Sequence, residues 1–177
     1  MEGLWAPWRM EFLIEARSGG DECVFCTLPH EEGRLRENLV VARGRHAFVI
    51  LNKYPYNNGH LLVVPYRHIA EYTGLTPAEH AECARLTSRS IEALAAEYRP
   101  DGFNLGMNLG KAAGAGIAGH VHQHIVPRWG GDTNFMPVIA ETKSLPEHLR
   151  RTWDRLRPHL AAEDAPDGPS HRPEARG

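Results

Sequence analysis

Three histidines at alternate positions, His120, His122 and His124, are the residues of this chain best suited to carry out chemistry. They stand in the stretch GAGIAGHVHQHIVPRW, residues 114–129, directly after a group of glycines. Residues two apart on a β-strand share a face, so the three imidazoles are expected on one side of a strand, roughly 6.5–7 Å apart. A neutral imidazole can attack a phosphorus atom, bind a metal ion or transfer a proton at neutral pH.

The glycines before the triplet imitate a dinucleotide-binding turn. Gly114, Gly116 and Gly119 spell the G-x-G-x-x-G pattern, which binds a pyrophosphate only where a helix follows it. The residues that follow are rich in β-branched side chains and end at Pro127, which predicts a strand. The stretch GMNLGKAA also fails as a P-loop, because it is one residue short and Ala112 replaces the Mg²⁺-binding hydroxyl. Neither a nicotinamide nor a P-loop nucleotide site is therefore expected.

Two kinds of chemistry remain open for the histidine triplet. A single metal ion held by all three imidazoles is disfavoured, because ligands about 2.0–2.1 Å from the ion cannot be drawn from three successive positions of one straight strand. Covalent catalysis needs only one of the rings as the nucleophile on phosphorus. The phosphoramidate is labile, and backbone N–H groups of the glycine-rich loop can stabilise charge on the phosphate oxygens.

The elements that would position these histidines follow from patterning. Residues 76–98 are predicted to form a helix, because Thr76, Pro77 and Glu79 form a capping box with proline at the first helical position. Cys83 falls on the apolar stripe of this helix and is expected in the core. A second helix is predicted for residues 145–160, and five strand-like runs for residues 38–42, 46–51, 60–64, 102–110 and 120–126. The absence of βαβ alternation indicates an α+β fold with an antiparallel sheet.

Length and composition fit one domain of ordinary globular type. The 177 residues divide into an N-terminal arm (1–20), a domain (21–160) and a polar, proline-rich tail (161–177) that is expected to be disordered. The net charge of −2, without a basic run, gives no reason to expect a nucleic-acid partner. No stretch resembles a signal peptide or membrane span, and three cysteines form no disulfide framework. The cytoplasm is the expected location.

Cys23 and Cys26 form a C-x-x-C pair with several interpretations. The pair is half of a zinc site, a redox pair, or two cysteines of the core. A thioredoxin-like redox role requires a βαβ unit, which the pattern lacks. A zinc site requires two further ligands, which the C-x-x-C pair alone does not identify.

The chain resembles the histidine triad (HIT) family of nucleotide hydrolases and transferases. The resemblance spans about residues 23–140 and rests on GHVHQHIVPRW, FVILNKYPYNNGHLLVVPYRH and GFNLGMNLGKAAGAG. The stretches WAPWR and PRWGGDTNFMPV are similar to the branch that contains diadenosine tetraphosphate (Ap4A) phosphorylases. The resemblance implies a five-stranded antiparallel sheet that pairs into a ten-stranded sheet in a homodimer. It also implies cleavage of dinucleoside polyphosphates, with phosphate as the acceptor.

The resemblance also implies roles for individual residues. His122 would attack the α-phosphorus and carry AMP, and His124 would hydrogen-bond a non-bridging oxygen or the leaving group; His120 completes the catalytic triad. The nucleotide-binding positions would be Asn52 at the ribose, Asn108, Ala115 and Gly116 at phosphate, and Trp129 against the substrate. Zinc-bearing members imply a structural Zn²⁺ held by Cys23, Cys26, His68 of PYRH, and His120.

Two departures from the family pattern bear on the reaction. The loop before the triad is GAGIAG, where many members carry glutamine or serine, so Gly116 offers only its backbone. The triad ends in His124, whereas the eukaryotic Ap4A phosphorylases end it in glutamine. Water therefore stays open as an alternative acceptor to phosphate, and a nucleotide-binding protein without catalysis is the alternative of a different class.

Overall fold

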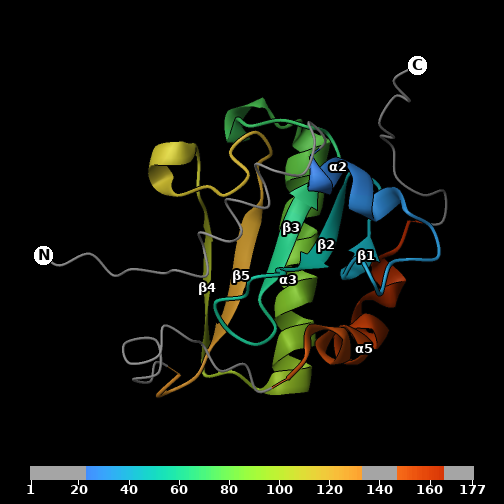
Figure 1. Cartoon of the computed structure of the whole chain (residues 1–177), viewed down its shortest axis with the longest axis vertical. Helices are drawn as coiled ribbons and strands as arrows, with labels where there is room; N and C mark the ends of the chain where they lie inside the picture. Colours follow the sequence, from blue (N-terminus) through green and yellow to red (C-terminus); the bar gives the residue numbers. More distant parts are fainter. Residues whose placement is uncertain (1–22, 133–146, 166–177) are drawn as a thin grey trace, which may run out of the picture.

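The computed structural model describes residues 23–132 and 147–165, and its centre is a five-stranded antiparallel sheet. The strand order is β1-β2-β3-β5-β4, as Figure 1 shows. The strands are β1 (Val40–Arg43), β2 (Ala47–Leu51), β3 (Leu61–Pro65), β4 (Gly102–Met107) and β5 (Gln123–Arg128). The predicted α+β class and the antiparallel sheet are confirmed.

The register of the sheet brings distant parts of the chain together. Strands β2 and β3 are buried along their whole length, and Phe48 pairs with Val64 across them. Strand β5 then lies between β3 and β4, with His124 opposite Leu62 on one side and Gly106 on the other. The backbone of His124 is thereby fixed on both sides, by β3 and by β4.

The long helix α3 (Pro77–Tyr98) packs behind β2 and β3 in the view of Figure 1. Its start is the predicted capping box: the Thr76 side chain accepts from the Glu79 N–H, and the Glu79 carboxylate accepts from the Thr76 N–H. Cys83 and Leu86 are buried on the face toward the sheet, so the core position predicted for Cys83 is confirmed.

The other helices cover the opposite ends of the molecule. Helix α5 (Leu149–Leu160) lies beside β1, and α2 (Val24–Thr27) with the 3₁₀ turn η1 (Leu28–His30) lies near the ends of β2 and β3 (Figure 1). Three further 3₁₀ turns are η2 (Tyr72–Gly74), η3 (Lys111–Ala113) and η4 (Ala161–Glu163). The turns of α2 and η1 are too short for an apolar period to reveal them in the sequence.

Strand β1 lies at one edge of the sheet, and its backbone carbonyls are occupied. The indole N–H of Trp153 donates to the Val40 carbonyl (2.8 Å), and the Arg157 guanidinium donates to the Val41 carbonyl (2.6 Å). The Ala165 N–H donates to the Arg43 carbonyl (2.8 Å). These bonds block the β1 edge as a template for another strand.

Two predicted boundaries near the C-terminus are corrected. The last helix begins at Leu149 rather than residue 145, because the His148 side chain is the N-cap and accepts from the Arg150 N–H. The chain also packs on the domain past the predicted limit at residue 160, through η4 and up to Ala165 among the described residues. Asp164 holds this extension in place, since its carboxylate accepts from the Arg43 N–H and the Arg157 guanidinium.

Three boundaries of the last two predicted strands also change. Strand β5 begins at Gln123, not residue 120, because the Val121 N–H donates to the Ile69 carbonyl (2.7 Å) instead of to a neighbouring strand. It continues through Pro127 and ends at Arg128, and β4 ends at Met107 rather than residue 110. His120 and His122 therefore approach the sheet on an irregular segment.

Some predictions lie outside the described residues. These are the N-terminal arm (1–20) and the part of the predicted tail beyond Ala165. Among the residues that the structure describes, the helices are too short or too polar to cross a lipid bilayer.

Candidate active site and metal cluster

His120, the first histidine of the triad, is fully buried. Its Nε2 is 2.8 Å from the Pro65 carbonyl oxygen, so Nε2 carries the hydrogen, because a carbonyl only accepts. The lone pair of Nδ1 then faces two thiols, Cys23 Sγ at 3.4 Å and Cys26 Sγ at 3.6 Å. Burial, with smaller effects of His68 and His122, lowers the pKa of His120 to about 4, so the ring is neutral and suited to be a metal ligand.

His122 is also buried, and its ring is oriented by its own neighbour in the chain. Its Nδ1 donates to the backbone carbonyl of His120 at 2.8 Å, which leaves the lone pair on Nε2. Burial lowers the pKa of His122 below its ordinary value of 6.5, partly offset by this hydrogen bond. At neutral pH the ring is therefore uncharged, with a nucleophilic nitrogen on the side away from the backbone.

His124 is connected to a fourth histidine, His60, which the sequence analysis did not single out. The Nδ1 of His60 accepts from the Tyr56 N–H (3.0 Å), so its hydrogen is on Nε2 and is donated to Nδ1 of His124 (2.9 Å). His124 in its neutral form then carries its own hydrogen on Nε2 and acts as a donor there. Its ring lies 5.1 Å from that of His122, centroid to centroid.

His60 could have been found from the sequence if the pairing of the predicted strands had been worked out. It precedes β3 directly, and the antiparallel pairing of β3 with β5, the strand that contains His124, brings its position beside His124. The sequence places the two histidines 64 residues apart, so only the tertiary pairing shows their contact.

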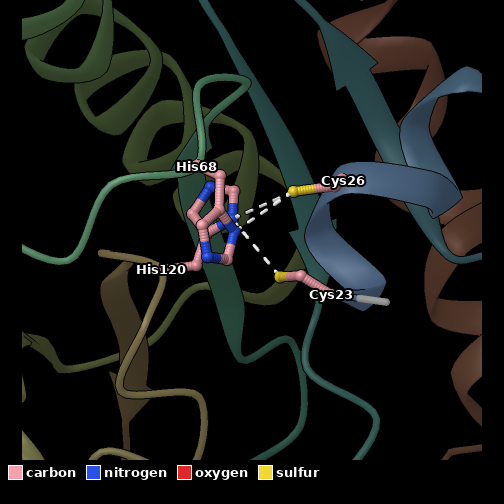
Figure 2. A group of neighbouring side chains, drawn as sticks. All are labelled: Cys23, Cys26, His68 and His120. Atoms are coloured by element: carbon pink, nitrogen blue, oxygen red, sulfur yellow. Dashed lines mark hydrogen bonds between the residues drawn. The ribbon is translucent and has the colours of Figure 1, made fainter. Parts of the chain in front are cut away.

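The side chains of four residues that could bind a metal ion converge at His120, the first residue of the triad; we call these four residues the metal cluster. The ligand atoms of Cys23, Cys26, His68 and His120 all lie within 4.8 Å of one another, and Figure 2 shows the two rings facing the two thiols. The cysteines come from the chain around α2, His68 follows β3, and His120 precedes β5. These four residues could hold a metal ion, and they are the set that the family resemblance implied.

The chemistry of the donors fits a divalent cation. Burial, followed by the charge and hydrogen bonding of Cys23, raises the pKa of the Cys26 thiol to about 12. Two sulfurs and two imidazole nitrogens converge here, and a bound cation would reverse this effect by stabilising the thiolates. Two sulfur and two nitrogen ligands are also the set that tetrahedral Zn²⁺ prefers in closed structural sites.

The predicted nucleotide-binding residues fall at two places. The Asn52 side chain lies beside His60, the partner of His124, with its Nδ2 3.4 Å from Nδ1 of His60 and its Oδ1 accepting from the Tyr54 N–H. Asn108 follows β4, whose last residue Met107 pairs with Gln123, so Asn108 lies at the triad end of the sheet.

The glycine-rich loop also joins the sheet at this end. Ala115 and Gly116 lie in it, and Gly110 and Gly114 adopt positive φ angles of 81° and 82° where the chain turns. The Ala115 N–H donates to the Gly110 carbonyl (3.3 Å), so of these two residues Gly116 is better placed to offer its amide to a phosphate.

Trp129 is the predicted site residue that the structure does not bring to the histidines. It follows the last residue of β5, five positions after His124, which corresponds to roughly 16 Å along a strand. Its backbone N–H donates to Asp132, whose carboxylate is held by Arg128 and Asn57. A contact between Trp129 and a substrate stays a prediction.

A family model for the HIT domain matches residues 35–131. The chain belongs to the histidine triad (HIT) family. A relative from Mycobacterium tuberculosis named AP-4-A phosphorylase is 44% identical over 159 residues, which cover 86% of this chain and 80% of the relative. A HIT-like protein from Methanocaldococcus jannaschii is 33% identical over 110 residues, which cover 62% of this chain and 81% of that protein.

Solved structures of the HIT family support the same fold. A Zn-bound histidine triad family protein from Mycobacterium smegmatis aligns with a TM-score of 0.61 and 28% identity, over 80% of this chain and 94% of that one. A histidine triad nucleotide-binding protein from Sulfolobus tokodaii aligns with a TM-score of 0.61 and 26% identity, over 79% of this chain and 93% of that one. The HIT fold predicted from the motifs is therefore confirmed.

The metal cluster generates a prediction about its ligands. Replacing Cys26 by serine should remove tightly bound metal from this HIT protein, because serine is a poor ligand for the soft ion that this donor set selects. The measurement is the metal content per chain after gel filtration, by atomic emission.

The matched control is Cys83→Ala, which removes a thiol that is buried against the sheet and outside the cluster. This variant should retain metal like the unchanged protein. Equal metal content in the Cys26→Ser variant and the unchanged protein would contradict the assignment of the cluster.

Proposed function

We propose that this HIT protein cleaves dinucleoside polyphosphates, with Ap4A as the substrate, through an AMP group carried on His122. The observation that carries the proposal is the bond from Nδ1 of His122 to the His120 carbonyl, which leaves Nε2 as the nucleophile. The name of the M. tuberculosis relative, AP-4-A phosphorylase, supports the choice of substrate and of phosphate as acceptor.

The first step forms the covalent intermediate. Nε2 of His122 attacks the α-phosphorus, the P–N bond forms, and the bond from phosphorus to the bridging oxygen breaks, so that ATP leaves with the electron pair. His124 donates from Nε2 to a phosphate oxygen as charge develops, and the Gly116 N–H of the Ala115–Gly116 segment adds a further donor together with Asn108. Asn52 binds the ribose hydroxyls.

The second step transfers AMP to the acceptor. An oxygen of inorganic phosphate attacks the same phosphorus, the P–N bond breaks and ADP is formed, which restores the lone pair of His122. With water as the acceptor the product is AMP. A network from Tyr56 through His60 keeps His124 in the donor tautomer during both steps.

We infer that the metal of the cluster is zinc in a structural role. Four protein ligands leave no open coordination position for substrate or water. The ion would hold α2, the segment after β3 and the start of the triad together, with His120 as the ligand from the triad. The two thiols of the cluster require a reducing compartment, which agrees with the cytoplasm.

The test of the function is turnover of Ap4A with and without inorganic phosphate, with nucleotides separated by chromatography. With phosphate we expect equal amounts of ATP and ADP, and without it little turnover. AMP and ATP in both arms would identify a hydrolase that uses water. Turnover at the background rate in both arms would contradict the proposal and leave a nucleotide-binding protein.

Substitution of the two proposed catalytic histidines separates their roles. His122→Ala should abolish both turnover and the AMP adduct, because the nucleophile is lost. His124→Ala should slow turnover by about 10²–10⁴-fold, the range for a single proton donor, and still form the adduct. Intact-protein mass spectrometry after rapid quenching measures the adduct.

His159→Ala serves as the control for the histidine substitutions, because this residue lies on α5 and bonds Glu97 away from the triad. It should turn over Ap4A at the rate of the unchanged protein. An AMP adduct on the His122→Ala variant would contradict the assignment of the nucleophile.

We infer that two copies pair through β4 into a ten-stranded sheet. Strand β4 forms the second sheet edge, and it exposes Leu105 with 49% of its surface accessible, while the β1 edge is blocked. Light scattering should give a mass near twice 19.8 kDa, and Leu105→Asp should shift it to that of one chain. A single-chain mass for the unchanged protein would contradict the dimer.

A further inference from the structure

Phe25 connects the metal cluster with the histidine that we propose as the nucleophile. It lies between the two cysteines of the cluster, on the short helix α2, and only 5% of its surface is exposed. Its ring centroid is 5.5 Å from that of His120 and 5.2 Å from that of His122. One side chain therefore contacts both a ligand of the cluster and the ring beside it.

The two contacts differ in geometry. The Phe25 ring meets His120 nearly edge to face, with an interplanar angle of 82°, and meets His122 at a tilt of 55°. A third ring, Phe48 of β2, lies 6.5 Å away and supports Phe25 from the sheet. Phe25 is thus part of a packed aromatic cluster that includes His122.

The position of Phe25 depends on its neighbours in the chain. Helix α2 has four residues, and a helix of one turn is not stable by itself because nucleation costs more than one turn returns. The Cys26 N–H donates to the Cys23 carbonyl (2.9 Å), so the turn is tight and moves as a unit with the two thiols. A metal ion that fixes the two thiols would therefore also fix the position of the Phe25 ring.

The hydrogen bond to the His120 carbonyl fixes His122 at only one point. The ring can still turn about its side-chain bonds within the tolerance of this hydrogen bond, and Nε2 would move with it. The tilted contact of Phe25 with the ring limits that motion, and a displacement of about 1 Å in a reacting atom can cost two orders of magnitude in rate.

We propose that Phe25 is a positioning residue that transmits the state of the metal cluster to the ring of His122. The inference rests on the proposed function, since it assigns His122 the nucleophilic role. It predicts that replacing Phe25 by a smaller side chain changes two rates together: the rate at which zinc leaves the cluster, and the rate at which the AMP adduct forms.

The experiment compares zinc-loaded Phe25→Ala, Phe25→Leu and Val24→Ala with the unchanged protein, well below their unfolding temperatures. Val24 is the matched control, because it lies on the same turn with 45% of its surface exposed. Zinc release is followed with a chelating dye, and adduct formation by rapid-quench mass spectrometry over a range of Ap4A concentrations.

We expect Phe25→Ala to release zinc faster and to form the adduct about tenfold more slowly, with KM for Ap4A within about threefold. Phe25→Leu keeps apolar volume and should fold with zinc bound, with adduct formation about threefold slower; it carries the test if the alanine variant does not fold. Val24→Ala should change neither rate. A purely structural role would lower the melting temperature without this split between rate and KM.

The outcomes separate this inference from the proposed function. If the unchanged protein and Val24→Ala form the adduct but the folded Phe25 variants form it at the same rate, the role of Phe25 is overturned. If the unchanged protein forms no adduct at all, the proposed function fails, and the inference fails with it.

Discussion

The assignment of hydrogens to ring nitrogens is the constraint on which this site depends. The backbone carbonyls of Pro65 and His120 can only accept, so each fixes one nitrogen of a histidine as the donor and leaves the other with a lone pair. For His120 the lone pair faces two thiols, and for His122 it faces away from the backbone. Adjacent positions of one motif thereby acquire different chemistry, one suited to hold a metal and the other to attack phosphorus.

Burial strengthens the division of roles that the hydrogen bonds set up. It lowers the pKa of both rings, so that at neutral pH no proton competes with the metal or the phosphorus atom for the free ring nitrogen. The third ring, His124, is held differently, by His60 rather than by a carbonyl, and so keeps a hydrogen to donate. The irregular segment before β5 allows this variety, because a regular strand would engage the Val121 N–H in the sheet rather than with Ile69.

Much of the architecture could be predicted because its signals are local. The capping box at Thr76 and the β-branched runs of β2 and β3 lie within a few residues of what they determine. The four-residue set of the metal cluster was predicted only through the family resemblance, since the C-x-x-C pair supplies half of it.

The features that were missed depend on contacts between distant residues. The bond of His60 to His124 spans 64 positions, and the docking of Asp164 beside Arg43 spans 121. The start of β5 depends on the Ile69 carbonyl, which no pattern around the triad reveals. The roles of Asn52, Asn108, Ala115, Gly116 and Trp129 toward a nucleotide stay predictions.

The occupied carbonyls at the β1 edge limit how far the C-terminus of the protein can be truncated. Trp153, Arg157 and Ala165 donate to the carbonyls of Val40, Val41 and Arg43, which are three of the four residues of that strand. A stop codon placed directly after Leu160 would preserve α5 and yet uncover the Arg43 carbonyl and deprive Arg157 of Asp164. Such a protein would expose a partly unpaired strand edge, to which strands of other molecules could add in a concentrated solution to form filaments. Residues 161–165 prevent this by covering the edge.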